Sequence, residues 1–270
     1  MNLAHRYLEK ETFTSYEDFS QNLKIKVPDS FNFAYDIIDE YARLEPERPA
    51  LVWCNDHGEE RRFTFADLKY WLKSLGIEKG DKVMLILRRR YEFYFFVLAL
   101  CKIGAVYIPS TNQLKEKDIV YRVNAAGIKM VVTYNWPETI ECVEASRHET
   151  PTLEKTVLVG GEHEGWLNFD EGIRHASEKW DRPGEAIKNE DLMLIYFTSG
   201  TTSMPKMACH DFTYPLGHIV TAKYYHMVEE NCLHITVAES GWAKFGWGKL
   251  YGQWICGAVQ FVYDMERFDP

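Results

Sequence analysis

The apolar positions of the chain follow two alternating patterns, and their order predicts the fold class. Short, continuously apolar runs are typical of buried strands and lie at 83–87, 105–108, 130–133 and 157–159. Stretches expected to form helices lie between and beside them, at 92–103, 116–125 and 138–147. Gly104 and Gly127 follow two of these stretches and are expected to end the helices. Strands that are apolar on both faces and separated by helices indicate a parallel sheet covered on both sides, so we predict an α/β fold.

The segment before this alternation predicts one helix and one hairpin. Residues 31–44 carry their apolar side chains on one helical face. Two short strands at 50–53 and 61–63 flank the turn sequence Asn-Asp-His-Gly. Thr64, followed three residues later by Asp67, resembles a capping box and predicts the start of another helix.

A polar stretch at 180–191 has little to bury and is expected to connect two α/β lobes. The strands expected after it lie at 192–197, 206–209, 233–237 and 258–263, with helices at 216–225 and 249–255. We therefore predict a first lobe over residues 1–180. A second, incomplete lobe is expected over residues 181–270.

The chemistry of the chain concentrates where the strand at 192–197 ends. Six small residues follow it, five of them with hydroxyl groups, before Pro205 and Lys206. Hydroxyls and unhindered N–H groups wrap oxyanions, and a lysine adds a positive charge, so this loop suits a phosphate chain. The Walker pattern of Gly-x-x-x-x-Gly-Lys-[Ser/Thr] is not in the sequence. A Ser/Thr-rich surface turn between two strands is the alternative interpretation.

Composition excludes several classes of protein. The 270 residues carry a net charge of -9, which argues against a nucleic-acid surface. The one dense basic run, 88–90, is interpreted as a solvated turn. No apolar run is long enough to span a membrane, and the N-terminal residues lack the apolar core of a signal peptide, so a cytoplasmic location is expected. The six cysteines show no Cys-x-x-Cys pair and the histidines no metal-ligand spacing, so we expect no metal site.

The loop and its flanks resemble one family in particular. Residues 196–206, Tyr-Phe-Thr-Ser-Gly-Thr-Thr-Ser-Met-Pro-Lys, are similar to the signature of the adenylate-forming (AMP-binding) superfamily. Segments 210–218 and 239–244 resemble its medium-chain acyl-CoA synthetase branch, which is close to the acetyl-CoA synthetases. Further similarity at 104–109 and 119–123 extends the resemblance over about residues 31–270.

This resemblance implies a ligase that activates a short- or medium-chain carboxylate with ATP and then transfers the acyl group from AMP to CoA. The residues implied to hold the ATP phosphates are Thr198, Ser199, Gly200, Thr201, Thr202, Ser203 and Lys206. Mg²⁺ is implied to bridge the phosphate oxygens. Gly241 and Trp242 match the segment that lines the acyl pocket, with an ordinary core aromatic as the alternative for Trp242. Gln113 aligns with a glutamine near CoA, with a solvated loop residue as the alternative.

The chain departs from the family pattern in two ways. Ser203 stands where the family usually has a glycine that lets the backbone approach phosphate closely. The family's magnesium motif, ribose-binding aspartate, hinge and carboxylate-contacting lysine would all lie beyond Pro270, together with the C-terminal domain. We therefore assign no catalytic residue and expect the 270 residues alone to be inactive. A non-catalytic nucleotide-binding or interaction remnant is the alternative function, and acyl-chain length and oligomeric state stay open.

Overall fold

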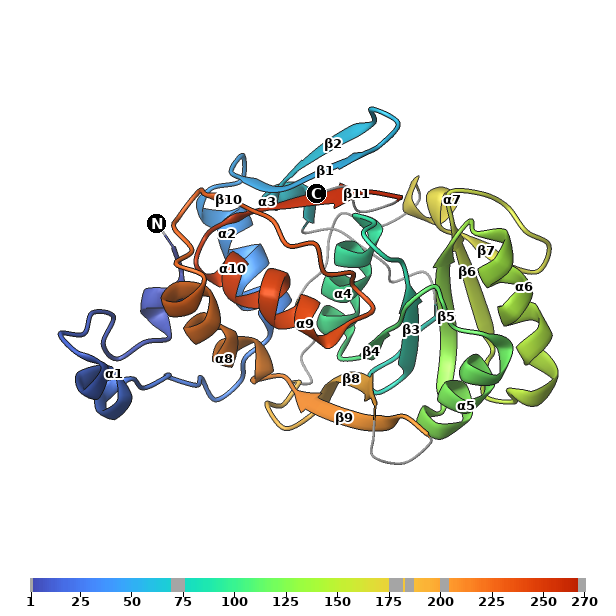
Figure 1. Ribbon diagram of the computed structural model, residues 1–270, viewed down its shortest axis with the longest axis horizontal. Helices are drawn as coiled ribbons and strands as arrows, with labels where there is room; N and C mark the ends of the chain where they lie inside the picture. Colours follow the sequence, from blue (N-terminus) through green and yellow to red (C-terminus); the bar gives the residue numbers. More distant parts are fainter. Residues whose placement is uncertain (1, 69–75, 175–181, 183–186, 200–203, 267–270) are drawn as a thin grey trace.

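Two sheets and the helices between and around them make up the computed structural model, which describes residues 2–68, 76–174, 182, 187–199 and 204–266 (Figure 1). The larger sheet has the strand order β7-β6-β5-β3-β4-β8-β9. Its strands are β3 (Lys82–Ile86), β4 (Val106–Pro109), β5 (Ile128–Tyr134), β6 (Lys155–Val159), β7 (Leu167–Asn168), β8 (Leu192–Thr198) and β9 (Lys206–Asp211). All neighbours are parallel except β8 and β9. The predicted α/β class is confirmed.

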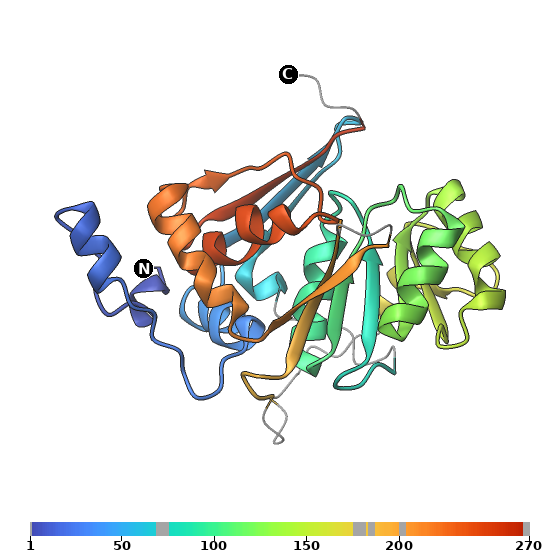
Figure 2. The same ribbon diagram turned by 60° about the horizontal axis from the view of Figure 1, so that its bottom comes forward.

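The smaller sheet has the order β10-β11-β1-β2 and joins both ends of the chain. Its strands are β1 (Pro49–Asn55), β2 (Glu60–Thr64), β10 (Leu233–His234) and β11 (Val259–Asp264). β1 and β2 form the predicted antiparallel hairpin, whereas β11 runs parallel to β1 (Figure 2). The strand expected at 233–237 is shorter than predicted, because only its first two residues pair with β11.

The helices follow the predicted order, with several short turns that the apolar pattern did not reveal. They are η1 (Ala4–Arg6), α1 (Tyr16–Asn22), η2 (Ala34–Asp39), α2 (Glu40–Leu44), α3 (Phe65–Leu68), α4 (Glu92–Ile103), α5 (Glu116–Ala126), α6 (Pro137–Ser146), η4 (Arg147–Glu149), α7 (Phe169–Arg174), α8 (Tyr214–Val220), η5 (Thr221–Tyr225), α9 (Ala243–Phe245), η6 (Gly246–Leu250) and α10 (Tyr251–Ile255). Gly104 and Gly127 end α4 and α5 with φ of 80° and 66°, as predicted. The Thr64–Asp67 capping box is also confirmed, since Asp67 N donates to Thr64 Oγ1 at 3.2 Å and Thr64 N donates to Asp67 Oδ2 at 2.7 Å.

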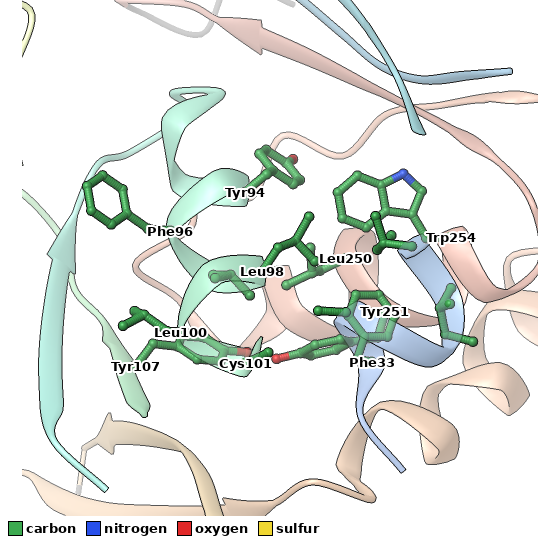
Figure 3. Close-up of a cluster of buried hydrophobic side chains, with 14 of the residues drawn as sticks. Phe33, Tyr94, Phe96, Leu98, Leu100, Cys101, Tyr107, Leu250, Tyr251 and Trp254 are labelled. Atoms are coloured by element: carbon green, nitrogen blue, oxygen red, sulfur yellow. The ribbon is translucent and has the colours of Figure 1, made fainter. Parts of the chain in front are cut away.

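Helix α4 lies at the centre of the core (Figure 3). Tyr94 packs against Trp254 of α10 with ring centroids 5.5 Å apart. On the other side of the helix, Phe96 packs against Phe169 of α7 at 4.9 Å. Because α4 is buried on nearly all of its surface, it reads as a continuous apolar run and joins the two sheets into one core.

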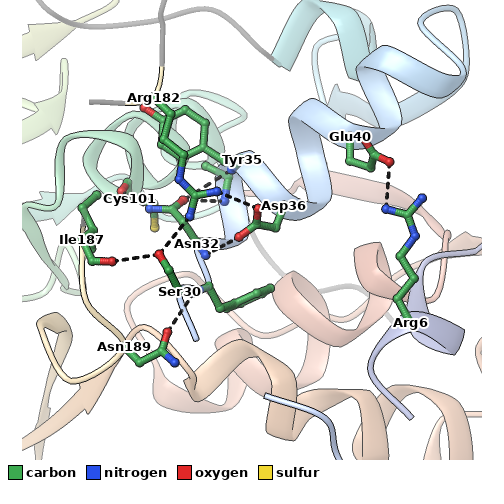
Figure 4. Close-up of polar contacts among 12 residues, drawn as sticks. Arg6, Ser30, Asn32, Tyr35, Asp36, Glu40, Cys101, Arg182, Ile187 and Asn189 are labelled. Atoms are coloured by element: carbon green, nitrogen blue, oxygen red, sulfur yellow. Dashed lines mark hydrogen bonds and ion pairs between the residues drawn. The ribbon is translucent and has the colours of Figure 1, made fainter. Parts of the chain in front are cut away.

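The connection near residues 182–191 is tied to the beginning of the predicted helix at 31–44 (Figure 4). Arg182 forms an ion pair with Asp36 at 2.9 Å and donates to Ser30 Oγ at 3.3 Å. The Ser30 hydroxyl donates to the carbonyl of Ile187 at 3.2 Å, and Ile187 itself is buried. This part of the connection therefore packs against the protein more than its polar sequence predicts.

Strand pairing crosses the expected boundary between residues 180 and 181 in both directions. Strands β8 and β9 complete the sheet of β3 to β7, while β1 and β2 pair with β11. The sheets are thus built from residues far apart in sequence. The division into lobes 1–180 and 181–270 stays a prediction.

Candidate functional site

The hydroxyl-rich loop connects the two strands of an antiparallel hairpin. Thr198 at the end of β8 pairs with Lys206 at the start of β9, and its Oγ1 donates to the Lys206 carbonyl at 3.4 Å. Thr198, Ser199 and Lys206 are exposed at the loop end of this hairpin. The hairpin therefore brings together two hydroxyls and an ammonium group, which are donors suited to phosphate oxygens. Four residues predicted to bind phosphate lie outside the described part of the chain: Gly200, Thr201, Thr202 and Ser203.

Helix α5 supports the hairpin from one side. The Tyr121 hydroxyl donates to the Pro205 carbonyl at 2.7 Å. The Arg122 guanidinium lies 4.9 Å from the Phe197 ring centre and donates to Ser110 Oγ at 3.3 Å. Tyr121 and Arg122 also line a cavity of about 250 Å³ together with Pro205.

Arg122 is a cation beside the β8–β9 hairpin that the sequence pattern did not reveal. Burial lowers the pKa of its guanidinium below the ordinary 12.5, against the opposing effect of Asp118. No carboxylate forms a salt bridge with Arg122 among residues 2–68, 76–174, 182, 187–199 and 204–266. Its presence in the matched segment 119–123 was the signal available in the sequence.

An aromatic cluster fills the space behind the hairpin. Tyr214 of α8 contacts His210 of β9 and His218, with ring centroids 3.9 Å and 4.5 Å apart. His218 also stacks on Tyr251 at 5.7 Å. Burial, together with the charge of His210, lowers the pKa of His218 to about 4. His218 is therefore a neutral packing residue near pH 7, in line with the interpretation of these histidines as core or surface residues.

A second cavity brings together two residues predicted separately. Gln113 and Trp242 both line a cavity of about 410 Å³, and Lys244 lies at its wall. Gly241 is not at the wall but packs against backbone, because a Cβ there would lie 2.5 Å from Thr111 N. The structure therefore places Trp242 and Gln113 at one site, with 53% of Trp242 exposed. An ordinary core position for this tryptophan is excluded.

The basic run 88–90 is not the solvated turn that the sequence analysis predicts. The side chains of Arg88, Arg89 and Arg90 are only 18%, 13% and 11% exposed. Arg90 pairs with Glu92 at 2.7 Å and with Asp264 at 3.6 Å. The local pattern misled because, apart from Glu92, the charged partners of these arginines, Glu239 and Asp264, come from distant parts of the chain.

Lys249 is a buried amine in η6. It is 2% exposed, and its Nζ donates to the Phe261 carbonyl at 2.5 Å. Burial, and secondarily the positive charge of Arg89, lowers the pKa of Lys249 to about 7. The amine is therefore partly neutral at physiological pH.

One group of potential metal ligands comes from the start of α5 and from η4. Ligand atoms of Glu116, His148 and Glu149 lie within 4.8 Å of one another, mostly at the surface. Exposed acidic groups often gather without binding an ion, so this group is not part of the site. No helix in the described part of the chain is long and apolar enough to cross a membrane.

The fold and the hairpin define the class of protein once they are compared with known families. The family described as "AMP-binding enzyme" matches residues 38–269, so this chain belongs to the AMP-binding enzyme family. Within it, the chain is similar to "Acyl-coenzyme A synthetase ACSM3, mitochondrial" of Homo sapiens, with 31% identity over 98% of this chain and 47% of the relative. It is 34% identical to ACSM4 of Mus musculus over 90% of this chain and 44% of the relative.

Solved structures agree with the fold. An acyl-CoA synthetase from Brucella canis superposes with a TM-score of 0.75 at 24% identity, covering 90% of this chain and 45% of that one. An acetoacetyl-CoA synthetase from Streptomyces lividans gives a TM-score of 0.77 at 19% identity, covering 90% and 40%. The chain thus spans about half the length of the curated relatives that it matches, corresponding to their N-terminal portion.

Proposed function

We propose that this chain is the N-terminal part of an ATP-dependent, AMP-forming acyl-CoA synthetase. In the first step a carboxylate oxygen attacks the α-phosphorus of ATP, so that an acyl-adenylate forms and pyrophosphate leaves. In the second step the CoA thiol attacks the acyl carbon, a thioester forms and AMP leaves. The substrate class proposed is a short- or medium-chain carboxylic acid.

The observation that carries this proposal is the loop end of the β8–β9 hairpin in a chain of the AMP-binding family. Lys206 and the hydroxyls of Thr198 and Ser199 are exposed there, where they can meet the departing phosphates. Because negative charge must be held as pyrophosphate leaves, preorganised donors at this position lower the barrier. The cavity of Gln113 and Trp242 is the proposed place for the acyl group and the approaching thiol.

Mg²⁺ would enter with ATP. Hydroxyls and an ammonium group suit phosphate oxygens, whereas Mg²⁺ prefers carboxylates, phosphates and water. The carboxylate lining the neighbouring cavity belongs to Asp118, which accepts from Lys115 N at 3.1 Å and so caps α5. The phosphate oxygens of ATP are therefore the main ligands proposed for the ion. CoA is the substrate proposed for the second step. The ion supplies charge neutralisation when bound.

We propose that the 270 residues alone do not form thioester from ATP, CoA and butyrate or hexanoate, because they span about half the length of the relatives that they match. Thioester formation by the purified 270-residue chain, measured by mass spectrometry, would show this part to be wrong. We also propose a cytoplasmic location for this protein. The names of the ACSM relatives include "mitochondrial", so imaging of the tagged gene product is the test that separates the two locations.

A further inference from the structure

The turn after β3 holds a segment from the far end of the chain. Arg88 adopts a φ of 42°, a left-handed conformation that is costly for a residue with a side chain. This conformation belongs to a turn in which the Arg88 carbonyl accepts from Ser240 N at 3.3 Å. A strained backbone persists only where the surrounding contacts hold it, so the contact with Ser240 identifies this turn as an anchor.

Arg89 adds a two-pronged contact to the same segment. Its Nη2 and Nε both donate to the Val237 carbonyl, at 3.0 Å and 3.4 Å. Its Nη1 lies 3.2 Å from Glu239 Oε1. Such a set of directed bonds from one planar group is specific to arginine, since a lysine ammonium cannot direct donors to both acceptors in the same geometry.

Part of the segment held in this way is exposed to solvent. Ile235 and Val237 are 47% and 52% exposed, so burial of their side chains contributes little to its position. Strand β10 ends at His234, and residues 235–239 belong to no strand or helix. Segments with little apolar burial and few backbone bonds open readily. Ala238 packs against the core and Ser240 is buried. The arginine contacts therefore restrain the exposed part of the segment, which ends at these two residues.

The held segment leads directly to the second cavity. Gly241 packs against the backbone of Ser110 and Thr111, where a Cβ would lie 2.6 Å from the Ser110 carbonyl carbon. Trp242 follows, and it lines the cavity together with Arg89 and Gln113. Any shift of the segment would move the indole of Trp242 relative to Gln113.

We propose that Arg89 is a positioning residue that holds segment 237–240 and thereby fixes Trp242 as the wall that limits acyl-chain length. The acyl ligand in this inference rests on the proposed function, whereas the restraint of segment 237–240 by Arg89 does not. The guanidinium acts through Val237 and Glu239 and needs no contact with the reacting atoms. Acyl chains that reach the indole are then sorted by a wall whose position is set by a turn that is far away in sequence and lines the same cavity.

Hydrogen exchange of the 270-residue chain tests the structural part. In Arg89→Ala we expect the amides of Ser240 and Trp242 to exchange about tenfold faster, because the segment loses the guanidinium contacts that keep it closed. Arg89→Lys keeps the charge but loses the fork, so it should approach the alanine variant. Arg62→Ala removes an arginine whose side chain is 77% exposed and should leave both amides unchanged. Exchange within twofold of the unsubstituted chain in a folded Arg89→Ala overturns the proposal. If Arg89→Ala does not fold, Glu239→Gln takes its place. In that variant we expect the same two amides to exchange at least threefold faster, and unchanged exchange overturns the proposal.

Kinetics of the complete gene product test the specificity part. In Arg89→Lys the ratio of kcat/KM for octanoate over butyrate should change at least fivefold, with the KM for ATP within twofold. A length profile unchanged within twofold, despite faster exchange, overturns the role in specificity. If the unsubstituted protein activates no acid, the proposed function fails, while hydrogen exchange still decides whether Arg89 holds the segment.

Discussion

Gly241 occupies a position where no side chain fits without moving backbone. A Cβ would lie 2.5 Å from Thr111 N and 2.6 Å from the Ser110 carbonyl carbon, and neither atom can rotate away as the end of a flexible side chain could. The glycine therefore allows two loops to meet, and the loops carry Gln113 and Trp242. Here a residue assigned to the acyl pocket serves as a spacer behind the cavity.

The Gly241→Ala variant should lose about 1–3 kcal/mol of unfolding free energy, since the two loops must separate to admit the methyl group. Urea unfolding measures the loss. Gly217→Ala is the matched control, because Gly217 lies exposed within α8 and a Cβ there meets nothing within 4 Å. That control should be neutral or stabilised by up to about 1 kcal/mol. Equal stability of the two variants would contradict the close backbone contact at Gly241.

Lys249 makes the stability of the protein depend on pH. The folded-state pKa of about 7 is below the ordinary 10.5, so between these values the unfolded chain binds a proton that the folded chain lacks. The contribution of Lys249 to stability therefore rises with pH from about 7 towards 10.5, by at most roughly 1.4 kcal/mol per pH unit. Below pH 7 the cost of the buried amine is complete.

The Lys249→Met variant should be more stable than the unsubstituted chain at pH 7, and this advantage should shrink as the pH rises to 10. Methionine removes the charge at similar volume. Urea midpoints at pH 7, 8, 9 and 10 give the comparison, and the difference between the two proteins cancels the titration of other groups. A difference that does not vary with pH would rule out a depressed Lys249 pKa.

At the scale of elements, the position of the β8–β9 hairpin depends on its contact with α5. The Tyr121 hydroxyl, which donates to the Pro205 carbonyl at 2.7 Å, holds the segment where β9 begins. Tyr121→Phe should cost about 0.5–1.5 kcal/mol, the usual net value of a hydrogen bond. Tyr225→Phe is its control, because Tyr225 is 78% exposed. Thermal unfolding compares the two, and an equal small effect would show that the bond contributes nothing to the hairpin.

The elements also show what the sequence could and could not predict. Strands β3 to β6 were predictable because both faces are buried, so that each reads as a continuous apolar run. The strand expected at 233–237 was too long, because the alternation there reflects a segment held by Arg89 instead of a paired strand. Local patterns report burial, but they do not report which distant element supplies the contact. For the same reason the burial of residues 88–90 was missed.

The candidate site likewise has a part that the sequence predicted and a part that it did not. The hydroxyl-rich loop was found because its chemistry is local in sequence, and the hairpin places Thr198 beside Lys206. The shared cavity of Gln113 and Trp242 could not be predicted, because it depends on how two distant loops pack. Arg122 was missed because a single arginine on a helix carries no pattern of its own.

At the scale of the whole molecule, Arg90 connects the two sheets. It follows β3 of the larger sheet and pairs with Asp264 at the end of β11 in the smaller one. It also pairs with Glu92, which is 1% exposed. The buried carboxylate of Glu92 thus depends on a guanidinium at the junction between the sheets.

Arg90→Met should destabilise the protein by about 3–5 kcal/mol, since it leaves the Glu92 carboxylate buried without its main partner. Arg62→Met removes an exposed arginine and should cost at most about 0.5 kcal/mol. Guanidinium unfolding followed by fluorescence measures both. A loss below about 1 kcal/mol for Arg90→Met would mean that the buried pair does not hold the sheets together.

We propose that the β8–β9 hairpin holds the phosphates of ATP in an acid-activating enzyme. This role can be measured by the exchange of labelled pyrophosphate into ATP in the complete gene product. We expect exchange that requires a short- or medium-chain acid, falls about 10- to 100-fold in Lys206→Ala, and is unchanged in Lys26→Ala, which removes an exposed lysine far along the chain. No acid-dependent exchange by the folded protein, or full exchange by Lys206→Ala, would contradict it.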